Sequence, residues 1–213
     1  MASLTRRLFS TKRRRLCETC RVIFDDTPFI KKVINMKEGI KMAEIIKCFK
    51  ESFPASRFIG KCYGDADRLN GSFGNKWGEW FGNGWFDVIE KVGHIEEDGG
   101  SYIGLMSVKE GKPFQYWIGM FTPVGSEVPD GFDCVDFDAA DLGTCWIYGS
   151  EQNDNIYGMH DACVAKVDNN WQIKDDFGDG VGEVWFYERY NCPRFTTPDS
   201  DGKIILDYCF YLK

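Results

Sequence analysis

Residues 184–190 have the sequence VWFYERY, an aromatic run that contains one carboxylate. In a β-strand successive side chains alternate between two faces, so Glu188 shares a face with Phe186 and Tyr190. One interpretation places Glu188 in solvent, paired with Arg189 or a cross-strand basic residue, because Glu is rarely buried. The other places it in an aromatic-lined space, where a carboxylate must be paired, protonated or able to bind a cationic or reactive ligand. The segment therefore predicts a strand and a candidate site.

Charge is distributed unevenly along the chain. Residues 1–42 contain eleven Lys/Arg against four Asp/Glu, a net charge of +7, whereas residues 43–213 contain fifteen against twenty-nine, a net charge of −14. An acidic body argues against direct nucleic-acid binding by the main domain and favours cationic ligands. It also allows docking on a basic protein partner. Aromatic residues make up 15% of the chain, a content that suits a pocket for flat organic molecules.

The change in charge divides the chain into a basic N-terminal extension, residues 1–42, and a main domain, residues 43–213. Three interpretations of the first segment stay open: a flexible basic tail, a targeting peptide, or an extension upstream of the true start. Cys17 and Cys20 form a CxxC pair in this segment, but no second pair follows at the spacing of a zinc ribbon. We therefore expect the pair not to bind metal.

The nine cysteines and two histidines limit the chemistry that the chain can carry. An odd number of scattered cysteines is typical of free thiols in a reducing, cytoplasmic setting. With only His94 and His160, a His-rich metal site or a histidine-based nucleophilic catalyst is not expected, and we interpret His160 as a packing residue. No apolar run has the length of a membrane span. We predict no metal, no cofactor and no membrane contact.

Hydrophobic spacing from residue 43 onward predicts an α+β fold. Helices are expected near residues 73–91 and 155–168. The glycines at 74, 78, 82 and 84 weaken the first helix or mark close packing against a sheet. Strands are expected at 56–63, 102–108, 113–121, 132–137, 142–148, 182–190 and 203–212. The strand-helix-strand-strand order occurs twice, which predicts two similar halves whose sheets flank a shared groove.

Eight segments together resemble the GyrI-like effector-binding domain, which is also found fused to AraC-type and MerR-type DNA-binding domains. The segments are RFIGKCY (57–63), SFGNKWGEWF (72–81), SYIGLM (101–106), FQYWIGMF (114–121), VPDGFDCVDF (128–137), WFYERY (185–190), PRFTTPDSDG (193–202) and IILDYCFYL (204–212). The resemblance implies two pseudo-symmetric βαββ halves with antiparallel sheets on either side of a ligand groove. Residues 1–54 do not contain a helix-turn-helix domain, so direct transcriptional regulation is not expected.

The resemblance also implies a function. Members of this family bind aromatic, often cationic compounds, and a Glu on the strand before the last faces the ligand; the matching residue is Glu188. Some stand-alone members hydrolyse cyclopropane-containing DNA alkylators with a Glu and an aromatic hydroxyl, which would make Glu188 and Tyr190 catalytic. Binding of hydrophobic or cationic small molecules is thus the predicted function, and cyclopropane hydrolysis is the alternative. The predicted ligand-binding residues are Glu188, Tyr190, Phe186, Tyr116, Trp117 and Trp146, although alternation prevents Tyr116 and Trp117 from both facing the groove.

Overall fold

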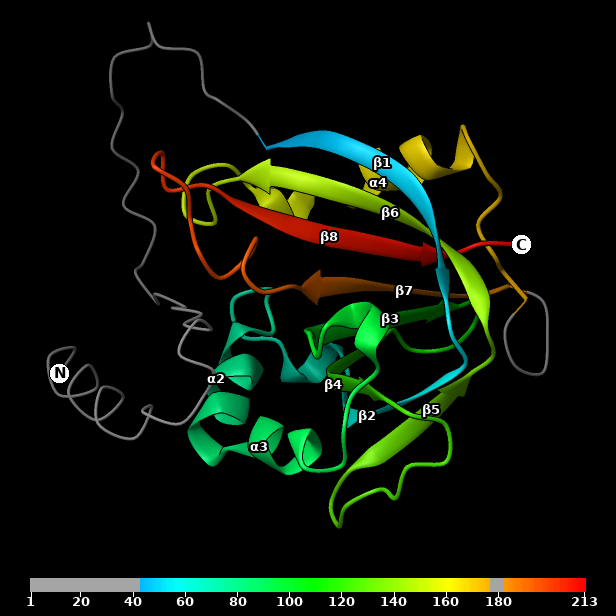
Figure 1. Cartoon of the computed structure of the whole chain (residues 1–213). Coiled ribbons are helices and arrows are strands. Elements are labelled where there is room, and N and C mark those ends of the chain that lie inside the picture. Colours follow the sequence, from blue (N-terminus) through cyan, green and yellow to red (C-terminus); the bar gives the residue numbers. More distant parts are fainter. Residues whose placement is uncertain (1–42, 177–181) are drawn as a thin grey trace, which may run out of the picture.

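The computed structural model describes residues 43–176 and 182–213, which form an α+β fold around one sheet (Figure 1). The strands are β1 (Glu44–Phe53), β2 (Ser56–Tyr63), β3 (Tyr102–Lys109), β4 (Gln115–Thr122), β5 (Asp133–Phe137), β6 (Ala140–Gly149), β7 (Glu183–Tyr190) and β8 (Ile204–Tyr211). The α-helices are α2 (Gly74–Asn83), α3 (Trp85–Glu90) and α4 (His160–Asp168), and the short 3₁₀ helices are η1 (Asp65–Asp67), η2 (Glu96–Asp98) and η3 (Ile156–Gly158). The basic segment and its CxxC pair lie outside the described residues.

The eight strands form a single sheet in the order β1-β6-β8-β7-β3-β4-β2-β5, and every neighbouring pair is antiparallel. The expected element order is present twice, as β2-α2-α3-β3-β4 and as β6-α4-β7-β8. In each set the last strand lies between the other two. The sequence predicted separate sheets, but β3 and β7 pair along their whole length, from Tyr102 opposite Tyr190 to Lys109 opposite Glu183, and join the sets into one sheet.

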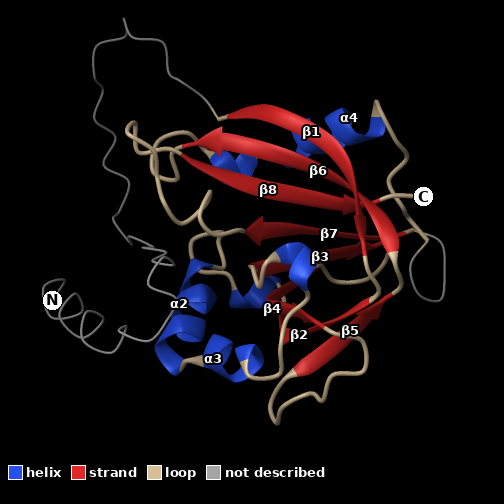
Figure 2. Cartoon of the chain, viewed as in Figure 1, coloured by secondary structure: helices blue, strands red, loops and turns tan. Residues whose placement is uncertain are grey.

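The two faces of the sheet carry different cores. Residues from α2, α3 and α4 pack with inward-facing residues of the strands on one face, where Trp80, Phe86, Ile118, Val167 and Leu206 are fully or almost fully buried (Figure 2). The opposite face has its own cluster, which includes Phe58, Leu105, Phe121, Tyr187 and Tyr211. Because both faces are buried, the central strands are apolar on both sides, and β7 and β8 show almost no exposed residue.

Charged residues on the second face satisfy one another. Arg189 donates from Nε to Asp207 at 2.9 Å and from a terminal nitrogen to Glu51 at 2.7 Å, and Arg194 also pairs with Asp207. Arg189 is 3% exposed and Asp207 is 0% exposed, so these are buried ion pairs that need one another. This arrangement contradicts the interpretation in which Arg189 pairs with Glu188, because alternation puts the two side chains on opposite faces.

The helices are shorter than the sequence predicted. The segment expected at 73–91 is interrupted by Gly84, whose φ of 66° is left-handed and ends α2 with a bond from its N–H to the Trp80 carbonyl. A side chain at Gly78 or Gly82 would meet no described heavy atom within 4 Å, so these glycines do not mark close packing against the sheet. The second helix begins at His160 rather than 155, because Asn155 has a positive φ of 48° and residues 156–158 form η3.

The sequence analysis did not predict β1. Its sequence, EIIKCFKESF, alternates poorly and has charged residues at four positions. β1 is an edge strand paired only with β6, and a register shift between Ile45 and Lys47 interrupts the ladder. Lys side chains and irregularities of this kind protect exposed edges from pairing with other chains, and they also hide the strand signal in the sequence.

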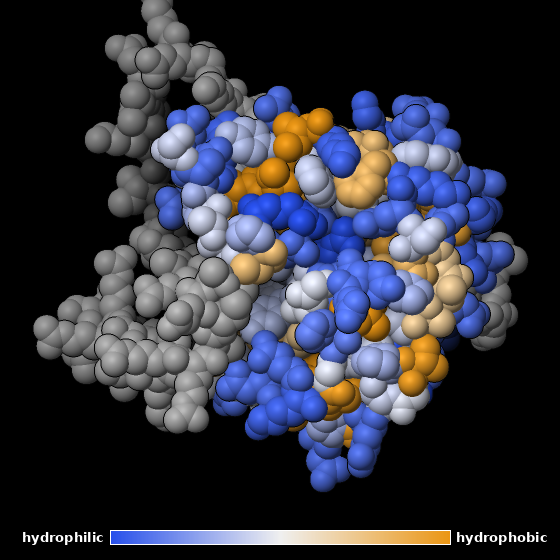
Figure 3. Space-filling model, viewed as in Figure 1, coloured by the Kyte–Doolittle hydropathy of each residue, from blue (hydrophilic) through white to orange (hydrophobic). Residues whose placement is uncertain are grey.

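The surface in Figure 3 is mainly hydrophilic, and its hydrophobic areas are separate from one another. One of them lies over β1, where Ile46 is 47% exposed. Scattered apolar side chains are normal on a protein surface. A protein partner for the acidic body therefore stays a prediction.

Candidate functional site

Glu188 lies at the centre of the sheet, on the face that the helices cover. Its neighbours in the register are Gly104 on β3 and Tyr208 on β8. Its side chain is only 7% exposed, and it belongs to the same face as Phe186, Tyr190 and Tyr208. In residues 43–176 and 182–213 no Lys or Arg forms an ion pair with it. Glu188 is therefore a buried carboxylate without a basic partner in the part of the chain that the structure describes.

A chain of hydrogen bonds leads to this carboxylate. Trp77 on α2 donates from Nε1 to the Tyr116 hydroxyl at 2.9 Å, Tyr116 is hydrogen-bonded to Tyr190, and Tyr190 donates to Glu188 Oε2 at 2.6 Å. The direction follows from the donors: an indole N–H can only donate, and each hydroxyl has one proton. Each proton consequently points toward Glu188. Such a chain stabilises the ionised carboxylate, and its members strengthen one another.

The relay depends on a glycine. A Cβ at Gly104 would lie 2.6 Å from the Tyr116 hydroxyl and 3.3 Å from Glu188 Oε2. The Tyr116 ring is also held from the other side, because Phe73 stacks on it with ring centroids 4.2 Å apart and planes 2° from parallel. Gly104 thus provides the space in which the hydroxyl and the carboxylate approach each other.

Burial controls the protonation of Glu188. Removal from water raises its pKa from the usual 4.5 to about 7, and the hydrogen bond from Tyr190 opposes part of this rise. The same burial, together with the nearby Glu188 charge, raises the pKa of Tyr190 and Tyr116 well above 10, so both hydroxyls keep their protons. A carboxyl group with this pKa is partly ionised near neutral pH, where it can attract a cation or accept a proton.

Aromatic rings surround the carboxylate. Trp77 and Phe195 contact Tyr190 edge-on at centroid distances of 4.7 Å each. Phe186 lies 5.7 Å from Phe210 in a stacked arrangement. These rings provide the faces that attract organic cations and aromatic compounds.

The segment before α4 adds residues that the sequence analysis did not select. Tyr157, 38% exposed, donates its hydroxyl proton to Glu151 at 2.6 Å. Burial around this hydroxyl raises its pKa, and the charges of Glu151 and Glu188 contribute to the rise. Burial also raises the pKa of Glu151. His160, at the start of α4, lies 2.9 Å from the Tyr208 hydroxyl through Nδ1.

The predicted site residues fall into two groups. Glu188, Tyr190, Phe186 and Tyr116 lie together on one face. Trp117 belongs to the cluster on the opposite face, where its ring lies 6.4 Å from Phe58. Trp146 is the register partner of Asp207 and lies beneath Lys47 and Arg194, at 4.5 and 5.1 Å from their charged groups. Aromatic content alone does not reveal a residue's face, so these two tryptophans are separated from Glu188.

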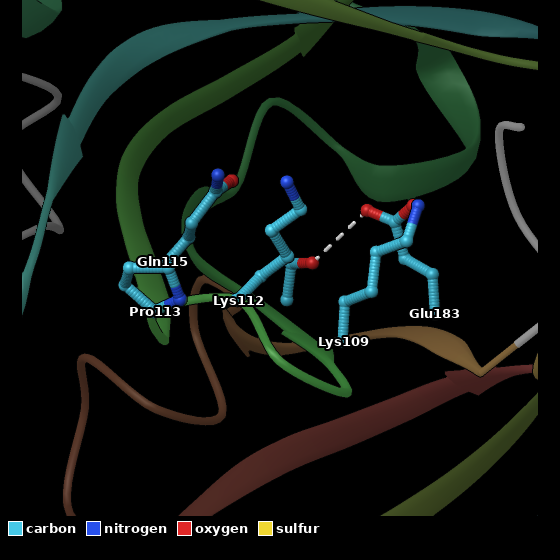
Figure 4. A pocket seen from close by; sticks show the side chains of 6 residues that line it. Lys109, Lys112, Pro113, Gln115 and Glu183 are labelled. Atoms are coloured by element: carbon cyan, nitrogen blue, oxygen red, sulfur yellow. Dashed lines mark hydrogen bonds and ion pairs between the residues drawn. The ribbon is translucent and has the colours of Figure 1, made fainter.

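A cavity of about 280 Å³ lies elsewhere, at the β3–β4 hairpin and the start of β7 (Figure 4). It is lined by Ser107, Lys109, Lys112, Pro113, Gln115 and Glu183. Its carboxylate already contacts Lys109 at 3.5 Å and Ser107 at 3.3 Å. Alternation along β7 places Glu183 on the face opposite Glu188, so this cavity is a separate feature.

Other classes of site receive no support from the described residues. Across 43–176 and 182–213, no group of three or more His, Cys, Asp or Glu side chains is arranged to hold a metal ion. Among the helices of the same residues, none has the length and apolar character needed to cross a membrane.

Comparisons with known proteins support the fold. No family model and no curated protein matches the sequence. Among solved structures, a presumed bacterial transcription regulation protein from Staphylococcus aureus MU50 has a TM-score of 0.54 at 12% identity and covers 78% of this chain and 98% of its own. The protein SAV2435, bound to tetraphenylphosphonium, has the same TM-score and identity and covers 79% and 94%. At this identity the likeness shows a shared fold.

Proposed function

We propose that this protein binds aromatic or hydrophobic small molecules, cationic ones above all, at Glu188. The observation that carries the proposal is the buried carboxylate, which lies among aromatic rings and has no Lys or Arg partner in the described residues. An ionised group in such surroundings is costly unless a positive charge compensates it. A delocalised organic cation provides that charge, and the rings of Trp77, Tyr116 and Tyr190 add cation–π attraction.

The arrangement of the sheet supports a groove at the same place. The two strand-helix-strand-strand sets have the same strand order, so we propose that they are related by a pseudo-twofold axis between β3 and β7. Glu188 lies on β7 beside this axis, with α2 on one side and α4 on the other. A protein with this fold binds tetraphenylphosphonium, a bulky aromatic cation, and this agrees with the ligand class that the carboxylate favours.

Side chains that cover Glu188 must move when a ligand binds. Glu188, Tyr190, Tyr116 and Phe186 are each less than a tenth exposed. Tyr157 is the aromatic residue near them that has substantial contact with solvent, and the Glu188 charge influences its hydroxyl. We therefore propose that compounds reach the carboxylate past Tyr157.

Titration with tetraphenylphosphonium tests the proposal. We expect Glu188→Gln, which keeps the shape of the side chain, to weaken binding by about 10- to 100-fold, since a poorly solvated charge pair is lost. Glu183→Gln is the matched control, because Glu183 lies on the same strand but on the opposite face. Equal affinities for the wild type and Glu188→Gln would contradict the proposal.

Hydrolysis of strained electrophiles is the second candidate. The observation in its favour is the Glu188 pKa of about 7, which suits a general base, together with the hydroxyl of Tyr190 at 2.6 Å. Glu188 would take a proton from water while a tyrosine hydroxyl donates to the oxygen that gains charge. Tyr190 now donates to Glu188 itself, so it would have to turn toward the substrate to serve in this role.

Turnover of a cyclopropane-containing alkylator distinguishes the two candidates. An enzyme should convert more than one substrate molecule per chain, and Glu188→Gln should slow it by about 10²–10⁴-fold. The control is a protein whose thiols have been blocked, because seven free cysteines in the described residues can each be alkylated once. Absence of multiple turnover leaves binding as the function.

A further inference from the structure

His160 and Tyr208 form a polar pair beside Glu188. Tyr208 is the register partner of Glu188 on β8, and directly opposed side chains on one face of an antiparallel pair have their Cβ atoms about 4.5–5.5 Å apart. The Glu188 charge contributes to a raised pKa of Tyr208, after the larger effect of burial. His160 reaches the Tyr208 hydroxyl from α4 at 2.9 Å. The pair thus borders the carboxylate on the side away from Gly104.

The hydroxyl of Tyr208 has one hydrogen-bonding capacity left. Burial lowers the pKa of His160 below 6.5, with Asp161 opposing the shift, so the imidazole is neutral at pH 7. If Tyr208 donates to Nδ1, a lone pair on its oxygen is left; if Nδ1 donates, the phenolic proton is left. The described residues provide no second partner for this hydroxyl, although the side chain is 3% exposed. Buried polar groups normally satisfy such a capacity.

The surroundings of the pair are apolar. The His160 ring lies 4.9 Å from Phe186 and 6.1 Å from Phe210, both measured between ring centroids. Phe186 is also stacked 6.0 Å from Tyr208. A flat compound that rests on Phe186 would therefore have Glu188 and the Tyr208 hydroxyl on neighbouring sides.

We propose that Tyr208, positioned by His160, is a second anchor of the Glu188 site and hydrogen-bonds an uncharged polar group of the bound compound. The inference rests on the proposed function. It specifies the ligand class as aromatic compounds that combine a cationic or proton-donating centre for Glu188 with a hydroxyl, amide or carbonyl group for Tyr208.

Two phosphonium probes test the anchor: tetraphenylphosphonium and its analogue with a single 4-hydroxyl group on one ring. In the Tyr208→Phe variant we expect affinity for the hydroxylated probe to fall about 3- to 10-fold, the usual net worth of one hydrogen bond, while affinity for the parent probe stays within about twofold. His160→Leu should show the same selectivity with a smaller loss, because Tyr208 keeps its hydroxyl but loses its orientation. Tyr148→Phe, which removes a hydroxyl that contacts Asp199 on β6, is the matched control and should leave both probes unchanged.

The outcomes are distinguishable. Equal losses for both probes would indicate that Tyr208 only maintains the structure, and equal affinities in the wild type and Tyr208→Phe would show that its hydroxyl does not contact the ligand; either result overturns the second anchor and leaves Glu188 in place. If the wild type binds neither probe, the proposed function fails, and the anchor fails with it.

Discussion

Replacement of Glu188 by Gln should change how the stability of the protein depends on pH. Gln keeps the shape of the side chain and can accept the hydrogen bond from Tyr190, but it cannot titrate. The folded pKa of about 7, against the usual 4.5, corresponds to about 3 kcal/mol of free energy of unfolding. Because Glu188 is 7% exposed, solvent does little to reduce this value.

The sign follows from the raised pKa. Below about pH 4.5 the carboxyl group is protonated in both the folded and the unfolded protein, and the stabilising contribution is complete. Between pH 4.5 and 7 the folded protein holds a proton that the unfolded chain has lost, so the free energy of unfolding falls as pH rises. Above pH 7 the contribution has been lost. The wild type should therefore lose stability relative to Glu188→Gln as pH increases.

Urea denaturation followed by tryptophan fluorescence at pH 4.5, 6, 7 and 8 measures the effect. The stability of the variant relative to the wild type should increase by about 3 kcal/mol across this range. Burial also raises the pKa of Asp98 to about 7, but Asp98 is present in both proteins and its contribution cancels. Glu79→Gln, on the outer surface of α2, is the control and should stay parallel to the wild type. Parallel curves for the wild type and Glu188→Gln would refute the reasoning.

Two further predictions concern packing and the buried ion pairs. Gly104→Ala should lower the free energy of unfolding by about 1–3 kcal/mol, because its Cβ would lie 2.6 Å from the Tyr116 hydroxyl; Gly78→Ala, which meets no described atom within 4 Å, should instead stabilise α2 by up to about 1 kcal/mol. Equal effects of the two substitutions in thermal denaturation would contradict this account of the relay. Asp207→Asn should cost about 3–5 kcal/mol, because Arg189 and Arg194 lose their shared carboxylate, yet the folded fraction should keep its affinity for tetraphenylphosphonium, since this network lies on the opposite face. Loss of ligand affinity in the folded Asp207→Asn protein would show that the two faces are coupled.

The sequence predicted most strands because their alternation is strong and both faces are buried. Residues 184–190 illustrate this: their alternation correctly placed Glu188, Phe186 and Tyr190 on one face. The edge strand β1 was not predicted, because its lysines and its register shift weaken the same signal. Local pattern is therefore informative where burial enforces it and much less so at edges.

The relay around Glu188 could not be predicted, because its members come from distant elements. Trp77 lies on α2, Tyr116 on β4 and Gly104 on β3, and only the order of the strands brings them together. His160 was expected to be a packing residue, and its contact with Tyr208 depends on where α4 begins. For Trp117 and Trp146 the sequence gave the aromatic character but not the face.

The release of protons on ligand binding tests the central claim most directly. A cation that binds beside Glu188 should favour the ionised carboxylate, so a group with a pKa of about 7 should release about half a proton at pH 7. Calorimetric titration with tetraphenylphosphonium in buffers of different ionisation enthalpy measures this number. We expect release of about half a proton at pH 7 and almost none at pH 9 in the wild type, and none at either pH in Glu188→Gln. Binding without proton release at pH 7, or equal release from the wild type and Glu188→Gln, would contradict the assignment of Glu188 as the group that meets the cation.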